Sequence, residues 1–98
     1  MDTVQLAKVL KALSHPNRLE LFLEIAKQNE ASFESGGECF ITDIIGSLNI
    51  GAPTISHHLK ELANAGLVTT RRRGKYLVAK VNKETFERVK RLLAMGED

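Results

Sequence analysis

The feature that most restricts the fold of this chain is a pair of helical segments followed at once by a cationic ribbon. Hydrophobic periodicity predicts a short helix over Asp43–Leu48 and a longer amphipathic helix over Pro53–Ala65, with a glycine-containing break between them. Two strand-like runs, Leu67–Arg72 and Lys75–Val81, then flank Arg73-Gly74, which is a hairpin signal. This order predicts a helix, a tight turn and a second helix, joined directly to a two-stranded β-ribbon.

Helices at both ends complete the predicted chain. Apolar spacing predicts a first helix over Thr3–Leu13, and Pro16 opens a second one, where the missing N–H of proline is harmless. Asn82 is expected to cap a last helix that ends near Met95. The 98 residues therefore predict one α+β domain over residues 1–98, a winged helix-turn-helix with the element order α-α-α-α-β-β-α.

Signals between the second helix and the helical pair are weaker. The polar segment Gln28–Glu38 predicts a loop, Cys39–Ile41 a short strand before the third helix, and Thr42 a helix cap. Arg18 is expected to stay on the polar side of the second helix. The main apolar stripe of that helix is expected at Leu19, Phe22, Leu23 and Ala26, with Leu21 and Ile25 beside it.

Positive charge is concentrated in the ribbon and the helix before it. The chain carries 14 Lys and Arg against 12 Asp and Glu, yet the segment from Gly51 to Asn82 holds six basic residues and one acidic residue. Such asymmetry suggests a surface that faces a polyanion. A solvated face of lysine and arginine is the simpler alternative, and charge alone does not separate the two.

A helix-turn-helix unit places its second helix in the major groove of DNA, N-terminal end first. The polar residues Thr54, Ser56 and His57 lie in that first part of the helix, and the ribbon tip brings cations to flanking phosphates. His58 follows Ile55 by three residues, so we expect it to be packed and hydrogen-bonded at the core boundary. The predicted DNA contacts are Pro53, Thr54, Ser56, His57, Lys60, Arg71, Arg72, Arg73 and Lys75.

Several segments resemble the ArsR-type repressors, a family of winged-helix regulators that sense metals and stress. Residues Ala12–Leu19 resemble the opening signature of that family, Thr54–Leu62 its recognition helix, Ala65–Val68 the exit of that helix, and Arg72–Lys75 its wing. The resemblance covers nearly the whole chain. It implies a dimeric repressor of transcription that binds operator DNA through the recognition helix, and an inducer that weakens this binding. It also implies that the first and last helices form the dimer interface.

The first helix has more apolar surface than a small monomer needs, because it carries two apolar edges. Together with the stripe of the last helix, this predicts a homodimer that presents two recognition helices to a palindromic double-stranded operator. The predicted interface residues are Val4, Leu6, Val9, Leu10, Phe86, Val89, Leu92 and Leu93.

The chain departs from the family at its metal sites. Metal-sensing members carry a Cys-x-Cys pair where this sequence has Phe40 and Thr42 ahead of Asp43, and their second site uses Asp and His residues that the segment Lys83–Met95 lacks. We therefore expect no metal, no cofactor and an effector of another kind. Cys39 is the single cysteine, and it is either a small buried hydrophobe or the thiol of a redox-responsive repressor.

Other classes of protein fit the sequence less well. No Gly-rich phosphate loop, G-x-S-x-G or H-E-x-x-H motif occurs, so we expect no enzyme. A protein-binding winged helix that does not touch DNA is a further alternative, but such a module has no need of the cations between Arg71 and Lys75. The start has no signal-peptide pattern and no apolar run approaches about 18 residues, so we expect a cytoplasmic protein without a membrane span.

Overall fold

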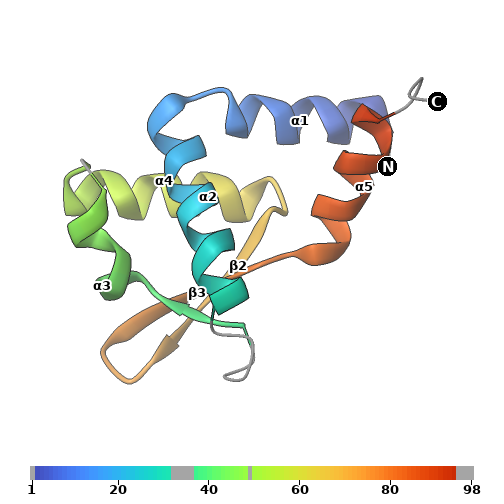
Figure 1. The fold of residues 1–98 in the computed structure, drawn as a ribbon. Helices are drawn as coiled ribbons and strands as arrows, with labels where there is room; N and C mark the ends of the chain where they lie inside the picture. Colours follow the sequence, from blue (N-terminus) through green and yellow to red (C-terminus); the bar gives the residue numbers. More distant parts are fainter. Residues whose placement is uncertain (1, 32–36, 49, 95–98) are drawn as a thin grey trace.

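Helices and a small antiparallel sheet make up the part of the chain that the computed structural model describes, which is residues 2–31, 37–48 and 50–94. The elements follow in the order α1 (Thr3–Leu13), α2 (Pro16–Ala31), β1 (Cys39–Phe40), α3 (Ile41–Ile44), the 3₁₀ turn η2 (Ile45–Ser47), α4 (Ala52–Asn64), β2 (Val68–Arg73), β3 (Tyr76–Val81) and α5 (Lys83–Leu93). The strand order is β1-β3-β2, and the β2–β3 ribbon projects away from the helices as a wing (Figure 1). This confirms the α+β winged helix-turn-helix.

Local signals define the two terminal helices. Asp2 Oδ1 accepts a 2.8 Å hydrogen bond from the N–H of Gln5 and caps α1, which has the predicted bounds. Asn82 Oδ1 accepts one of 3.3 Å from the N–H of Thr85 and caps α5, as predicted. The predicted end of the last helix at Met95 lies outside the described residues, and α5 ends at Leu93.

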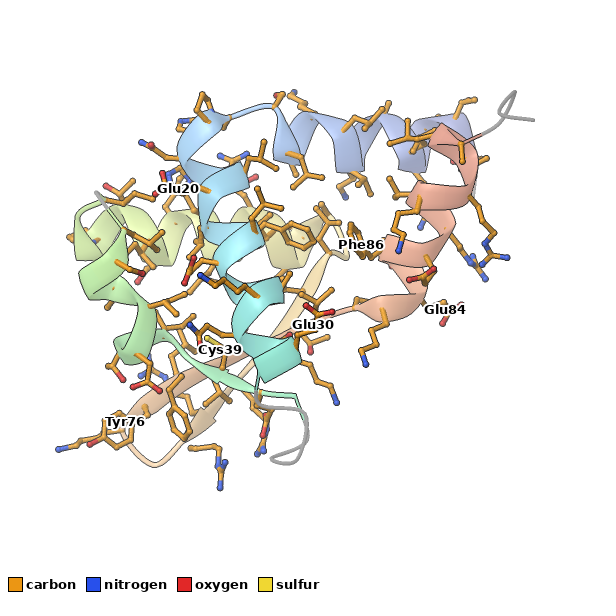
Figure 2. All side chains as sticks on the ribbon, viewed as in Figure 1. Glu20, Glu30, Cys39, Tyr76, Glu84 and Phe86 are labelled. Atoms are coloured by element: carbon orange, nitrogen blue, oxygen red, sulfur yellow. The ribbon has the colours of Figure 1, made fainter. Side chains whose placement is uncertain are left out.

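The predicted boundaries and apolar face of α2 were partly wrong. The helix continues to Ala31, so the first residues of the expected Gln28–Glu38 loop are helical. Leu21, Phe22 and Ile25 are fully buried, whereas Leu19 and Leu23 remain exposed. The reason is that α2 packs against α1, α4 and β3 at once, and these neighbours turn its buried face away from the expected stripe. Phe22 instead meets Phe86 of α5, with ring centroids 5.6 Å apart in an edge-on arrangement (Figure 2 labels Phe86).

The short strand before the third helix is present, but the predicted cap of that helix was wrong. β1 pairs with β3 through Cys39–Ala79 and Phe40–Val78. α3 begins directly after the extended residue Phe40, so Thr42 lies inside the helix and is exposed. The pairing of β1 with β3 holds Phe40 extended, and this long-range contact sets the start of the helix.

Glycines allow the tight connections on either side of β2. Gly66 has φ +79°, and the N–H of Leu67 donates to the carbonyl of Leu62 (3.0 Å), which closes α4 in a Schellman arrangement. Gly74 has φ +63° in the two-residue turn between the paired residues Arg73 and Tyr76. A positive φ at the first central residue alone is typical of a type II′ hairpin turn, which matches the twist of the strands.

Asn29 is a buried polar residue that the sequence did not single out. Its Nδ2 donates to the carbonyl of Ala79 (3.3 Å) and its Oδ1 accepts from the N–H of Val81 (2.6 Å). β1 is only two residues long, so the same edge of β3 would otherwise carry unpaired backbone groups beyond it. The side chain of Asn29 therefore continues the sheet from within α2.

Candidate nucleic-acid interface

Helix α4 divides sharply into a buried and an exposed face. Ile55, Leu59 and Leu62 are buried in the core. The helix starts at Ala52, one residue earlier than predicted, after Gly51, which makes no side-chain capping bond. First-turn N–H groups therefore have no side-chain acceptor from the cap. All the predicted contact residues of this helix are exposed: Pro53, Thr54, Ser56, His57 and Lys60.

His58 anchors α4 to the N-terminal helices. It is buried, and its Nδ1 accepts a 3.3 Å hydrogen bond from Nε of Arg18, whose Nη1 donates to the carbonyl of Ala12 (3.4 Å). The ring of His15 lies 4.8 Å from that of His58, centroid to centroid. Burial is the main reason that the pKa of His58 lies below its usual value, and the neighbouring His15 and Arg18 lower it further. The expectation of a packed, hydrogen-bonded histidine is confirmed, whereas Arg18 is half-buried and does not stay on a purely polar face.

The wing presents its cations on two different faces. Arg72 of β2 lies directly opposite Leu77 of β3, and Leu77 packs against the core on the helix side of the sheet. Because successive strand residues alternate, Arg72 points to that side, while Arg71 and Arg73 lie on the outer face. The exposed Lys75 lies at the turn, with Nζ 5.5 Å from the ring centroid of Tyr76.

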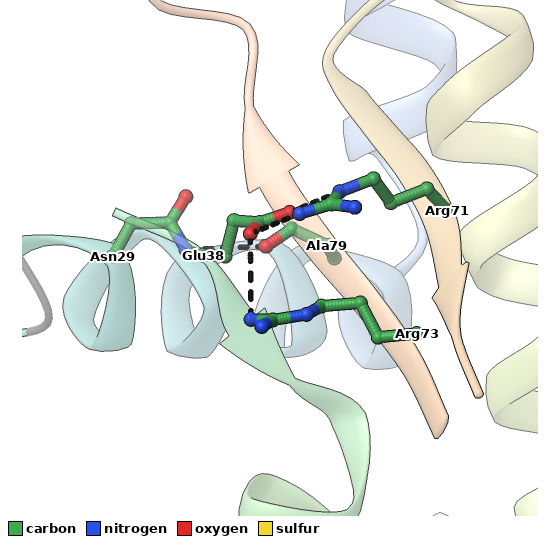
Figure 3. A network of polar contacts seen from close by, with 5 residues as sticks. All are labelled: Asn29, Glu38, Arg71, Arg73 and Ala79. Atoms are coloured by element: carbon green, nitrogen blue, oxygen red, sulfur yellow. Dashed lines mark hydrogen bonds and ion pairs between the residues drawn. The ribbon is translucent and has the colours of Figure 1, made fainter. Parts of the chain in front are cut away.

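On the outer face the sequence analysis missed an acidic partner. Glu38, just before β1, accepts hydrogen bonds from Nε and Nη2 of Arg71 at 2.6 and 2.7 Å, and Arg73 Nη1 lies 3.9 Å from its Oε1 (Figure 3). The Arg71 hydrogen bond is the largest reason that the pKa of Glu38 is lowered. Arg73 also lies over the ring of Phe40, 5.6 Å from its centroid. Sequence spacing could not reveal this pair, because Glu38 and Arg71 meet only through the register of three strands.

Cys39 lies on the inner face of the sheet and is buried (Figure 2). Burial, followed by the negative charges of Asp43 and Glu24, raises the pKa of its thiol to about 11. A sensor cysteine needs a lowered thiol pKa and access to solvent, which favours the interpretation of Cys39 as a small buried hydrophobe.

Among residues 2–31, 37–48 and 50–94, no three His, Cys, Asp or Glu side chains form a group that could hold a metal ion.

Helices α1 and α5 leave an apolar surface uncovered. Val4, Leu10 and Leu93 are 77%, 40% and 63% exposed, and Ala7 lies exposed between the two α1 residues. We call these four residues the α1–α5 apolar face. Val9 and Val89, which the sequence analysis placed in a dimer interface, are instead buried within one chain. The reason is that their sides of α1 and α5 face the core of the same protomer, against which Leu6 and Phe86 also pack. Leu92 is half-buried.

The helix-turn-helix and the wing define the class of the protein, a winged helix-turn-helix DNA-binding regulator. The model of the bacterial regulatory protein family arsR matches residues 15–70, and the chain belongs to this family.

Individual relatives agree with this assignment. The chain is 33% identical to the arsenical resistance operon repressor of Staphylococcus xylosus over 89% of its own length and 75% of that protein. It is 34% identical to the transcriptional repressor SdpR of Bacillus subtilis over 76% of this chain and 72% of that one. Among solved structures, it is similar to the homodimeric winged helix-turn-helix domain of Mb0332 from Mycobacterium bovis, with a TM-score of 0.69, 28% identity and coverage of 92% and 75%. The first two relatives are repressors, and Mb0332 is described as a possible transcriptional regulator of the ArsR family. Within the described part of the chain, no helix has the length and apolarity that crossing a membrane requires.

Proposed function

We propose that a homodimer of this chain represses transcription by binding a palindromic operator, and that an effector other than a metal releases it. The observation that carries the proposal is the exposed polar face of α4 beside the cations of the wing, on a scaffold of the arsR family. On this proposal the chain acts as one cytoplasmic domain over residues 1–98, without catalytic activity or cofactor, and its terminal helices mediate dimerisation.

We assign two kinds of DNA contact to the exposed residues. Thr54, Ser56 and His57 lie in the first half of α4, where a recognition helix meets base edges, and their hydroxyl and imidazole groups can read hydrogen-bonding patterns. Pro53 starts this segment, and its ring sets the approach of the helix to the groove. The remaining contacts are to phosphates, which add affinity without reading sequence, from Lys60, Arg71, Arg72, Arg73 and Lys75.

The α1–α5 apolar face is the surface that we assign to the dimer. Its side chains remain exposed in one protomer, and Mb0332 is described as homodimeric. A twofold dimer would place two copies of α4 in successive major grooves, roughly 34–36 Å apart. In this assignment Val4, Leu10 and Leu93 form the centre of the interface. The half-buried residues next to it are Leu6, Phe86 and Leu92.

The effector differs from that of an arsenical sensor. The chain resembles an arsenical resistance repressor, yet its single cysteine is buried and its thiol is protonated at neutral pH. Soft metals and arsenite need accessible thiolates. We therefore expect arsenite, zinc and cadmium to leave operator binding unchanged in an electrophoretic mobility shift assay.

Fluorescence anisotropy with an operator selected from a randomised pool, and with random duplex DNA, tests base reading by α4. His57→Ala should weaken operator binding by about 1–3 kcal/mol and random binding much less. Asn64→Ala is the matched control, because Asn64 is exposed at the opposite end of the same helix. Equal losses on both DNAs for His57→Ala, or no preference of the wild-type protein for any sequence, would contradict the proposal.

Sedimentation velocity tests the dimer separately. At tens of micromolar protein the wild type should be a dimer and Leu93→Asp a monomer, because the substitution places a charge in a desolvated contact. Leu23→Asp is the control, since Leu23 is an exposed leucine of α2 outside the assigned interface. A wild-type monomer at that concentration would rule out the dimer.

A further inference from the structure

Glu38 is the acidic group among the described residues that lies within ion-pair distance of the wing arginines. Its side chain is 17% exposed, compared with 60% for Arg71. Both carboxylate oxygens are engaged by the guanidinium of Arg71 in a fork arrangement. Two residues later in the chain, Phe40 is paired with β3, so the backbone beside Glu38 is held by the sheet.

The ion pair of Glu38 with Arg71 divides the cations of the wing into two groups. Arg71 and Arg73 lie on the outer face next to Glu38. Arg72 lies on the helix side of the sheet and Lys75 at the turn, and within the described part of the chain neither is within 4 Å of a carboxylate. A count of four free cations, as the sequence alone indicates, is therefore too high.

We propose that Glu38 is the internal counter-ion of the wing, a residue that withholds Arg71 and Arg73 from DNA phosphates and so sets the strength and salt dependence of DNA binding. This inference rests on the proposed function, and for Arg71 and Arg73 it replaces the phosphate contacts assigned above. Arg72 and Lys75 are then the wing residues that neutralise phosphates. Arg71 instead ties β2 to the segment before β1.

An arginine of the wing gains little when it leaves Glu38 to bind a DNA phosphate. An exposed ion pair by itself is worth little, so a guanidinium could leave it at small cost. The carboxylate, however, is held by the neighbouring strand and stays behind, partly shielded from water and close to the incoming phosphate. Its negative charge offsets the attraction that the freed arginine gains.

Glu38→Gln removes this charge and keeps the shape of the side chain. Each added phosphate contact steepens the log–log salt dependence of binding by about 0.9. We expect the slope to steepen by about 0.9–1.8 for each wing, and therefore by about 1.8–3.6 for the dimer. Each contact makes the loss of affinity between 50 and 200 mM salt about 3.5-fold larger. Operator and random DNA should both bind on the order of three- to tenfold more tightly at moderate salt.

Three further variants separate the counter-ion role from general charge and from folding. Glu84→Gln makes the same charge change on α5, where Glu84 pairs with Arg88 at 2.9 Å, and should leave the slope unchanged. Arg71→Ala should also leave it unchanged, whereas Arg72→Ala should reduce it by about 0.9 for each wing, which is about 1.8 for the dimer. The comparison of Arg71→Ala with Arg72→Ala tests the inference even if Glu38→Gln fails to fold, which thermal unfolding monitors for every variant.

Fluorescence anisotropy over a salt series, on operator and random duplexes, distinguishes the outcomes. A steeper slope for Glu38→Gln but not for Glu84→Gln, with Arg71→Ala like wild type, supports the counter-ion. Weaker binding by Glu38→Gln, a slope equal to that of Glu84→Gln, or equal slope losses for Arg71→Ala and Arg72→Ala overturns it. A wild-type protein that binds no DNA at low salt refutes the proposed function instead.

Discussion

Replacing Asn29 by alanine removes both side-chain hydrogen bonds that continue the edge of β3. The N–H of Val81 and the carbonyl of Ala79 then lose this partner in a buried region. An unsatisfied buried group costs about 1–3 kcal/mol, while alanine in α2 recovers about 0.6 kcal/mol of helix propensity. With two such groups, we expect the free energy of unfolding to fall by about 1.5–5.5 kcal/mol, a large share of the roughly 5–15 kcal/mol of a typical domain.

Urea unfolding followed by circular dichroism measures this loss. All variants are compared at one protein concentration, because dimerisation couples stability to concentration. Asn17→Ala is the matched control, since it is the same change on an exposed residue of the same helix. It should alter stability by no more than about 0.5 kcal/mol. If Asn29→Ala and Asn17→Ala differ by less than about 1 kcal/mol, the hydrogen bonds of Asn29 do not stabilise the edge of the sheet as argued.

Two other residues give predictions that depend on their burial. The pKa of His58 is lowered in the folded chain, so stability is complete above the unfolded pKa of about 6.5 and decreases as the pH falls below it. Thermal melts should show this decrease in the wild-type protein and in His57→Ala, but not in His58→Phe; an unchanged decrease in His58→Phe would assign it to other groups. Because burial raises the pKa of the Cys39 thiol to about 11, the native protein should react with a thiol reagent at neutral pH at least on the order of 100-fold more slowly than the unfolded chain. Cys39→Ser should leave operator affinity unchanged under reducing conditions, and rapid native labelling would restore the redox interpretation.

Much of the exposed face of α4, to which we assign DNA contacts, could be predicted from the sequence, because α4 is strongly amphipathic. The spacing of Ile55, Leu59 and Leu62 determined which side of α4 is buried, and therefore that Thr54 and His57 are exposed. The three-stranded register, by contrast, brings Glu38 to Arg71 across 33 residues of sequence. No local pattern encodes such a pair, since it depends on how β1 docks on β3.

The sequence by itself determined the order of the elements and the starts of α1 and α5, because the capping side chains Asp2 and Asn82 bond to backbone groups only three residues away. Only the tertiary structure decided which apolar residues are core and which are surface. α1 carries apolar residues on nearly all sides, and it is the packing of α1 on the rest of the chain that buries Val9 and leaves Val4 exposed. A local pattern shows that a helix has excess apolar area, but burial depends on the shape of neighbours that are distant in the chain.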